Sequence, residues 1–206
     1  MVVKKEICSS RKNIIDMLKL RDYDVDKYSN FTVNELEILM ENEQLDIEAC
    51  QIKNPTQKVI VKYLWKQTKI KTPSLVKEIN AVIENNNITD KNKSEYEIII
   101  VSKDKKSESL QKVLDEYNSK YYIQYFWIKT LMYNIMEHEF VPKHRILNNE
   151  EKDAIRKKYN IQNNQMPIIH RNDAVAQYLG MRAGDICEIT RQSETCGDSL
   201  TYRICV

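Results

Sequence analysis

The stretch YEIIIVS, residues 96–102, decides how this chain is expected to fold. Its apolar residues follow one another without a break, which is typical of a strand buried on both faces of a sheet. The next segment, residues 108–117, reads ESLQKVLDEY and is predicted to be a short helix. It leads into YYIQYFWI at residues 121–128, where β-branched and aromatic side chains favour a second strand. The order strand, helix, strand indicates a crossover connection in an α/β domain.

Another strand is predicted before this crossover, at residues 58–66, which read KVIVKYLWK. Its side chains alternate between two faces. One face is expected to carry Val59, Val61, Tyr63 and Trp65, and the other Lys58, Lys62 and Lys66 with Ile60 and Leu64 between them. The β-branched and aromatic residues again favour a strand over a helix.

Helix-start signals complete the N-terminal part. Thr72-Pro73 predicts a helix with threonine at the N-cap and proline at the first helical position. Thr32 and Glu35 have the spacing of a capping box, so a helix is expected to begin near residue 33. An amphipathic helix at 10–21 and a strand at 46–52 give the fold class, α/β (α+β) with a mixed sheet.

The composition is that of a globular protein of one or two domains. The chain has 206 residues, of which 42% are hydrophobic and 30% charged, with only four prolines and three glycines. No apolar run is long enough for a membrane helix, and the N-terminus has no signal-peptide pattern, so no membrane partner is expected. Its five cysteines form no CxxC pair and its three histidines are scattered, so neither metal nor another cofactor is expected.

The C-terminal tail has a different character, because all three glycines lie in it and allow tight turns. Asn148 and Glu151 predict a capped helix that ends near Tyr159. The tail is predicted to continue with an extended stretch at 166–170, a helix at 173–179 ended by Gly180, a strand at 185–191, a loop at 192–198 and a strand at 199–206.

The tetrapeptide Gly-Asp-Ser-Leu at 197–200 also matches the motif of an esterase family. A nucleophilic serine needs a histidine base and a turn that leads into a helix. Only seven residues follow Ser199, they alternate as a strand, and no histidine has an aspartate three positions before it. The sequence therefore argues against a hydrolase, and Gly197 and Asp198 are interpreted as the corner of a hairpin.

A longer pattern covers the last seventy or so residues, with matching order and spacing. The tail resembles the C-terminal assembly domain of the fifth subunit shared by the eukaryotic nuclear RNA polymerases, a family that also has an archaeal RNA polymerase member. The matching residues are Glu137-His138-Glu139, Val141-Pro142, His144, Pro167, Ile169, Asp173, Val175-Ala176, Tyr178-Leu179-Gly180, Gly184, Arg191, Ser193-Glu194-Thr195, Gly197 and Thr201-Tyr202-Arg203. Departures are Ile168, Ala174, Gln177, Glu188, Gln192 and Cys196, three of which replace a basic residue of the family pattern and indicate an altered partner surface.

The resemblance implies two domains and a structural role. Residues 1–136 correspond to a jaw-like domain beside downstream duplex DNA, and residues 137–206 to an assembly domain on the largest polymerase subunit, with a small neighbouring subunit as a further partner. The subunit would be non-catalytic. The implied assembly candidates are Glu137, His138, Pro142, His144, Pro167, Asp173, Tyr178, Arg191, Ser193, Glu194, Thr195, Tyr202 and Arg203. Arg191, Glu194 and Arg203 could equally form a local ion-pair network around the hairpin.

Charge is segregated in the N-terminal part, although the net charge is only +2. Residues 35–48 carry six acids and no base, and residues 49–77 carry seven lysines and no acid. This lysine block could contact phosphates or could be an ordinary solvated strand face. The candidates for DNA proximity are Lys58, Lys62, Lys66, Lys69, Lys71, Lys103, Lys105 and Lys106.

Two alternatives accompany the polymerase interpretation. The lysine-rich strand could belong to a free-standing nucleic-acid-binding protein, which would show salt-dependent affinity for DNA. The aromatic residues at 121–127 could stack on bases, but a buried strand is the stronger interpretation.

The richness in Asn, Ile and Lys suggests a polymerase subunit encoded by a large DNA virus, or else by a divergent eukaryotic parasite. The expected location is intracellular: host cytoplasm or virion if viral, nucleus if cellular.

Overall fold

The computed structural model describes residues 2–29, 31–66, 69–193 and 197–206. These residues form two compact units, Met1–Tyr133 and Asn134–Val206. The expected boundary at 136/137 is three residues later than this division, because Ile135 and Met136 pack against the core of the C-terminal unit. Each unit contains one four-stranded sheet with helices, so the α/β (α+β) class is confirmed.

The N-terminal unit is built around the sheet β1-β2-β3-β4. Its strands are β1 (Ile47–Cys50), β2 (Lys58–Leu64), β3 (Tyr96–Ser102) and β4 (Tyr122–Trp127). β1 and β2 are antiparallel, whereas β2, β3 and β4 are mutually parallel. The run of apolar residues at 96–102 is therefore a central strand. Five of its residues, Ile98 to Ser102, are buried along with Glu97, as expected for a strand covered on both faces.

The helices of this unit are α1 (Val2–Leu20), α2 (Val33–Glu41), α3 (Thr72–Asn85) and α4 (Glu108–Asn118). Their order among the strands is the predicted one. The capping box of α2 is confirmed, because the backbone N–H of Glu35 donates to Thr32 Oγ1 and Glu35 accepts from the Thr32 N–H. The predicted cap of α3 is one residue too late: Lys71 is the N-cap, Thr72 is already helical, and no side chain caps the helix.

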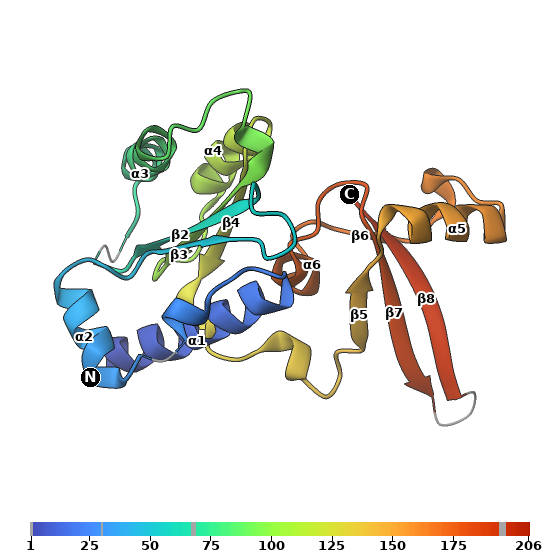
Figure 1. Ribbon diagram of the computed structural model, residues 1–206, viewed down its shortest axis with the longest axis horizontal. Coiled ribbons are helices and arrows are strands. Elements are labelled where there is room, and N and C mark those ends of the chain that lie inside the picture. The colour runs from blue at the N-terminus through green and yellow to red at the C-terminus, as the bar shows by residue number, and fades with distance from the viewer. Residues whose placement is uncertain (1, 30, 67–68, 194–196) are drawn as a thin grey trace. The chain divides into compact units, whose positions relative to one another are not determined.

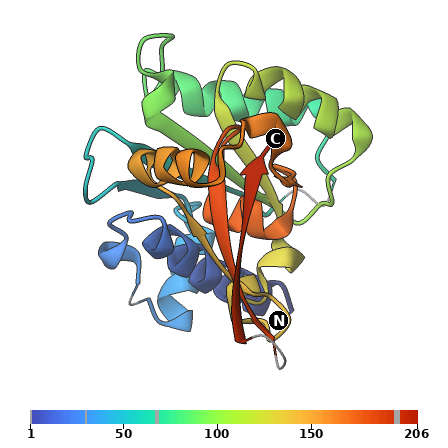
Figure 2. The same ribbon diagram turned by 90° about the vertical axis from the view of Figure 1, so that its right-hand side faces the viewer.

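Helices cover both faces of the sheet, with α3 and α4 on one face and α1 on the other in both views of the molecule (Figure 1, Figure 2). This corrects the expected lysine face of β2. Ile60 and Leu64, which lie on that face, are only 5% and 7% exposed and pack in the core beneath α3 and α4. The alternation of apolar and lysine residues was real, but helices rather than solvent cover this face.

The C-terminal unit contains the sheet β5-β7-β8-β6. Its strands are β5 (Lys143–Ile146), β6 (Ile168–Ile169), β7 (Ile186–Ser193) and β8 (Gly197–Cys205), and the long hairpin of β7 and β8 is prominent in Figure 2. The predicted loop at 192–198 was too long, because Gln192 pairs with Asp198 and Ser193 with Gly197. The register of the antiparallel pair extends the strands into residues whose polarity suggested a loop.

Two helices flank this sheet, α5 (Asn149–Tyr159) and α6 (Ala174–Leu179). The capping box of Asn148 and Glu151 is confirmed, as is the helix end at Gly180, where φ is 72°. Of the two sequence candidates for the N-cap of α6, Asn172 and Asp173, the structure has Asp173. Short 3₁₀ turns complete the chain at Asp26–Tyr28, Lys93–Glu95, Ile128–Leu131, Ile135–Glu137 and Asn163–Gln165.

Cys8, Cys50, Cys187 and Cys205 are free thiols. Burial raises the pKa of the Cys187 and Cys205 thiols, which keeps them protonated and unreactive. In the described part of the chain, no group of three His, Cys, Asp or Glu side chains could hold a metal ion. The described helices also include none with the length and apolar character needed to cross a bilayer.

Candidate functional site

The first candidate surface of the C-terminal unit is a hollow of about 770 Å³, here called the hairpin hollow. It is lined on one side by the segment from Glu139 to Lys143 and on the other by Thr190, Arg191, Gln192 and Asp198. Two of the predicted assembly residues, Pro142 and Arg191, meet in it. Phe140 also lines it and is 84% exposed, which is unusual for an aromatic side chain.

A second hollow of about 740 Å³ lies toward the other end of β8 and is here called the terminal hollow. It brings together Asp173 and Arg203, which are both predicted assembly residues, with the exposed side chains of Ile168 and Val206. Arg203 Nη1 donates to the carbonyl of Ile168 at 3.4 Å, which fixes the guanidinium at the rim. Each hollow thus brings together two of the predicted assembly residues, with one hollow toward each end of the hairpin.

Several other assembly candidates serve local structure. Glu137 accepts a hydrogen bond from Asn134 Nδ2 at 2.9 Å, and His138 lies beside the ring of Phe140 with centroids 5.7 Å apart. His144 Nδ1 donates to the Pro142 carbonyl at 2.7 Å. The Pro167 carbonyl accepts from the N–H of Ile204 at 2.9 Å and so positions β6 beside β8.

The remaining assembly candidates lie in α6 and near the tip of the hairpin. Tyr178 lies in α6 and is only 4% exposed, so it packs inside the C-terminal unit. The candidates Glu194 and Thr195 lie outside the described residues. Ser193 ends β7, where it pairs with Gly197.

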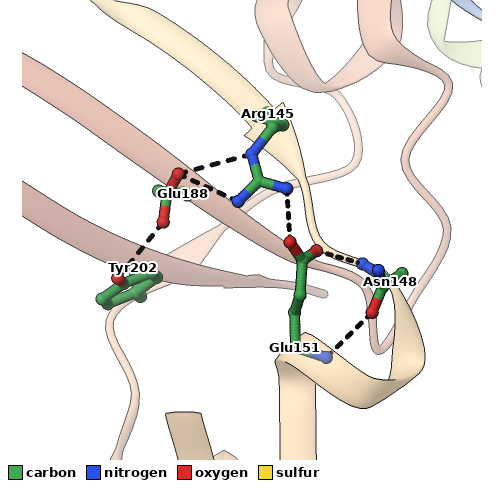
Figure 3. A network of polar contacts seen from close by, with 5 residues as sticks. All are labelled: Arg145, Asn148, Glu151, Glu188 and Tyr202. Carbon is green, nitrogen blue, oxygen red and sulfur yellow. Dashed lines mark hydrogen bonds and ion pairs between the residues drawn. The ribbon is translucent and has the colours of Figure 1, made fainter. Parts of the chain in front are cut away.

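A polar network connects β5, β7, β8 and the start of α5 (Figure 3). Arg145 is at its centre: Nη1 donates to Glu151 at 2.7 Å, and Nη2 and Nε donate to one oxygen of Glu188 at 3.1 and 3.4 Å. The other oxygen of Glu188 accepts from the Tyr202 hydroxyl at 3.2 Å. Glu151 also accepts from the backbone N–H of Asn148, so the same carboxylate caps α5 and pairs with the strand.

This network has clear electrostatic consequences. The hydrogen bond from Arg145, together with the Asn148 N–H, lowers the pKa of Glu151, and the bonds to Glu151 and Glu188 raise the pKa of Arg145. Burial and the neighbouring Glu188 carboxylate raise the pKa of Tyr202, which keeps its hydroxyl a donor.

Of the network residues, only Tyr202 was predicted from the sequence as an assembly residue. Arg145 and Glu188 are neighbours because they pair in the register of β5 and β7. This register cannot be predicted from the amino-acid composition. The alternative of a local ion-pair network among Arg191, Glu194 and Arg203 depends on Glu194, which lies outside the described residues. Glu188, noted as a departure from the family pattern, is the acid of β7 that binds Arg145.

Ser199 lies within β8, opposite Arg191 of β7, as the strand interpretation predicted. The turn from strand to helix that a nucleophilic serine requires is therefore not formed at this position. Gly197 has a φ of 69° and begins the strand, which agrees with its interpretation as a hairpin corner.

In the N-terminal unit, most of the candidate lysines gather at the carboxyl edge of the parallel strands. Leu64, Ser102 and Trp127 are aligned in the register, so the residues after them emerge at the same edge. The backbone N–H of Ile70 donates to Asp104 at 3.1 Å and ties the segment that carries Lys69 and Lys71 to the loop that carries Lys103, Lys105 and Lys106. This edge is where open α/β sheets usually bind ligands.

Two tryptophans lie among these lysines. The ammonium groups of Lys66 and Lys103 both lie 5.6 Å from the ring centroid of Trp65. Lys129 lies 5.4 Å from the ring of Trp127, whose indole N–H donates to the Lys103 carbonyl at 2.9 Å. We call Trp65, Lys66, Lys103, Trp127 and Lys129 the edge cluster. Lys129 and both tryptophans were not predicted as site residues, because only strand alignment brings them together.

Two candidate lysines, Lys58 and Lys62, lie away from this edge, and two at the edge, Lys66 and Lys106, are affected by an ion pair or by burial. Lys58 is at the opposite end of β2, beside the ring of Tyr96. Lys62 forms an ion pair with Asp46 at 2.7 Å; burial disfavours its charge, but the bond to Asp46 outweighs burial and raises its pKa. Lys66 pairs with Glu43, so part of its charge is already compensated. Burial lowers the pKa of Lys106, with Asp115 acting in the opposite direction.

The aromatic strand β4 is mainly a core element, as predicted. Tyr125 and Phe126 are only 7% and 6% exposed. Burial raises the pKa of Tyr125, whose hydroxyl donates to the carbonyl of Asp104 at 2.8 Å. The strand is therefore no stacking platform along its length, and only Trp127 at its end joins the edge cluster.

Comparison with known families gives one match, the model described as "RNA polymerase Rpb5, C-terminal domain", over residues 133–205. The matched residues cover nearly the whole compact C-terminal unit, including the hairpin hollow, the terminal hollow and the Arg145 network.

Curated relatives extend the similarity toward the N-terminus. The chain is 38% identical over 108 residues to "DNA-directed RNA polymerases I, II, and III subunit RPABC1" of Caenorhabditis elegans, and equally to that of Caenorhabditis briggsae, over 52% of this chain. These alignments span 51% of the nematode proteins, about half of their length. The protein of the same name from Dictyostelium discoideum is 29% identical over 198 residues, which is 95% of both chains.

Proposed function

Because residues 133–205 belong to the RNA polymerase Rpb5 C-terminal domain family, we propose that the chain is a non-catalytic subunit of a multisubunit DNA-directed RNA polymerase. The observation that carries this proposal is the agreement between the family match and one complete folding unit. The similarity to the Dictyostelium subunit over 95% of both chains supports the same role for the N-terminal unit.

The C-terminal unit docks on the largest polymerase subunit, with a small subunit as a neighbour. The hairpin hollow supports this assignment, because an aromatic side chain at 84% exposure beside a hollow is a typical anchor for a partner. Arg191 and Lys143 at the same rim add charge that can orient the partner. The Arg145 network stiffens the strands that present these groups.

Co-expression with the largest subunit tests this docking. Phe140→Asp is expected to reduce the recovered complex strongly, because it puts a charge where an apolar anchor is required. The matched control is Ile52→Asp, which changes another exposed apolar residue, in the N-terminal unit. Equal recovery of the complex with wild type and Phe140→Asp would show that the hairpin hollow is not the docking surface.

The N-terminal unit lies near downstream duplex DNA in this proposal. The edge cluster supplies cations for phosphates beside two indole rings, with Lys69, Lys71 and Lys105 close by. Acidic partners such as Glu43 and Asp104 lie at the same edge, so weak contact with DNA is expected and not strong independent binding.

Crosslinking of assembled polymerase to downstream DNA tests this part. Lys103→Glu is expected to reduce crosslinking to this chain, whereas Lys58→Glu at the opposite end of the sheet is expected to leave it unchanged. Equal effects of the two substitutions would indicate only a change in total charge.

The free-standing nucleic-acid-binding protein stays as the second candidate, favoured by the lysine–tryptophan stacks. It predicts that the isolated chain binds DNA with an affinity that falls steeply as salt rises. Either role places the protein inside cells: in the host cytoplasm or virion if the gene is viral, and in the nucleus if it is cellular.

A further inference from the structure

Arg11, in the middle of α1, is a buried cation that forms no ion pair with a carboxylate among the described residues. Its side chain is only 2% exposed, and a guanidinium stays protonated in proteins. Its Nη1 donates to the carbonyl of Leu45. Its Nε–H is buried and has no hydrogen-bond partner in the described part of the chain. An uncompensated charge of this kind favours the approach of an anion.

Asp46, the carboxylate that attracts the Arg11 guanidinium, already accepts hydrogen bonds from other groups. This carboxylate accepts from Lys62 at 2.7 Å and from the Tyr63 N–H at 3.0 Å. The guanidinium instead faces aromatic rings, with Cζ 5.7 Å from the centroid of Tyr28 and 5.8 Å from that of Phe31. Cation–π contacts of this kind replace only part of what a carboxylate would provide.

A pocket of about 300 Å³ opens beside Arg11, between α1 and the segment that leads into α2. Its walls include Ile15, Leu36 and the two rings. Phe31 and Val33 at its edge are 38% and 58% exposed, so the apolar surface continues outside the pocket. Three cations, Arg11, Lys12 and Lys19, line it against one carboxylate, Asp16.

We propose that this pocket binds an acidic, apolar peptide segment of a protein partner. A carboxylate of the segment is directed toward Arg11, and a neighbouring apolar side chain lies on Phe31 and Val33. The volume is small for a free ligand but suits one or two side chains. The exposed apolar rim requires a ligand that continues beyond the pocket, as a peptide does and a small carboxylate does not.

The surrounding charges define the sequence that fits. Lys12 and Lys19 are exposed on α1 and favour further acidic residues on that side. Burial is the main cause that raises the pKa of the Cys8 thiol, and the nearby carboxylate of Glu37 in α2 is the second. The negative charge of Glu37 therefore disfavours acidic residues of the segment on the α2 side of the pocket. The segment should therefore present its carboxylates toward α1 and its apolar side chains toward Phe31 and Val33.

NMR spectroscopy of the full chain with nitrogen-15 in its arginines tests the proposal. The probe is the blocked pentapeptide acetyl-Ala-Leu-Glu-Phe-Ala-amide, and the matched control contains Gln in place of Glu. The Glu peptide should shift the Nε–H signal of Arg11 in a saturable way, and the Gln peptide should bind about tenfold more weakly or worse, as expected for a hydrogen bond to a charged group. A pocket that merely encloses a buried water would leave this signal unchanged and would contradict the proposal.

Surface variants provide a second readout that does not depend on altering the buried arginine. Lys19→Glu should weaken binding of the Glu peptide about threefold or more. Lys5→Glu, on the same helix but outside the pocket lining, should not. Equal weakening by the two variants, equal binding of the two peptides, or no saturable shift at millimolar peptide each overturns the proposal. None of these results depends on polymerase assembly.

Discussion

At the scale of single residues, the N-terminal unit depends on a buried ion pair. Arg21 and Glu97 form it with side chains that are each 6% exposed, and Tyr23 and Gln124 add hydrogen bonds at 3.1 and 3.0 Å. Glu97 is an acid on a central strand of an apolar sheet, and burying its charge costs desolvation free energy. The ion pair and the hydrogen bonds offset this cost only while all these partners are present.

Glu97→Gln is therefore expected to lower the free energy of unfolding of this unit by about 3 kcal/mol, since it leaves a buried guanidinium without its counter-charge. Both tryptophans of the chain lie in the N-terminal unit, so tryptophan fluorescence during urea unfolding reports this unit alone. The exposed Glu84→Gln on α3 is the control and should change the midpoint little. A loss as small as that of the control would mean that the pair contributes nothing.

Glu151 gives a prediction about pH. Its pKa is lowered in the folded state by Arg145 and the Asn148 N–H, so its contribution to stability is complete above the ordinary carboxylate pKa of about 4.3. The contribution is lost as pH falls through the lower, folded pKa. Glu151→Gln should thus lower the melting temperature of the C-terminal unit at pH 7, and its difference from wild type should shrink in acid.

NMR signals of residues 134–206 during heating measure this difference, and Glu150→Gln in the same helical turn is the matched control. The network around Arg145 uses Glu151 and not Glu150, so the control substitution should leave the pH profile parallel to that of wild type. A Glu151→Gln deficit that stays constant down to about pH 3, below the ordinary carboxylate pKa, would contradict the assigned ion pair.

At the scale of elements, the sequence predicted the order and the type of the helices and strands well. The predictions failed where contacts with other elements determine burial or strand length. Capping boxes and the run at 96–102 are local signals, and the predicted order of helices and strands in the N-terminal unit is confirmed. The alternation of β2 could not reveal that α3 and α4 cover its lysine-bearing face. The length of the β7–β8 hairpin was missed because pairing, not polarity, extends the strands.

The same distinction applies to the candidate surfaces. The resemblance to a family named residues one at a time. The structure places four of them in two hollows and buries Tyr178, while others make local contacts. The edge cluster and the Arg145 network depend on strand register. Sequence spacing alone therefore could not have predicted Trp65 beside Lys103, or Arg145 beside Glu188.

Asp173 gives a prediction for one element, α6. Its carboxylate accepts from the N–H groups of Val175 at 2.9 Å and Ala176 at 3.4 Å. Asp173→Ala should destabilise this helix by about 1 kcal/mol, whereas Asp173→Asn keeps the cap and should cost much less. Hydrogen exchange of the α6 amides measures both variants, and equal protection in Ala and Asn variants would argue against a capping role.

At the scale of the whole molecule, the C-terminal unit carries the family match and the N-terminal unit carries the edge cluster and the Arg11 pocket. In the proposed function the C-terminal unit therefore provides assembly, whereas the N-terminal unit is proposed to contact DNA and a further partner. Substitutions in the two units should therefore have separate effects. Phe140→Asp is expected to affect incorporation into the polymerase, Lys103→Glu to affect crosslinking to DNA in the assembled polymerase, and Lys19→Glu to affect only peptide binding at the Arg11 pocket.

The central claim is that this chain is a polymerase subunit held by its C-terminal unit. The most direct measurement is affinity purification of the tagged chain from its native source, with the co-purifying chains identified by mass spectrometry. We expect recovery of the largest RNA polymerase subunit in a one-to-one ratio, and its loss when the chain ends at Tyr133. Recovery of the full-length chain without any polymerase subunit would contradict the claim.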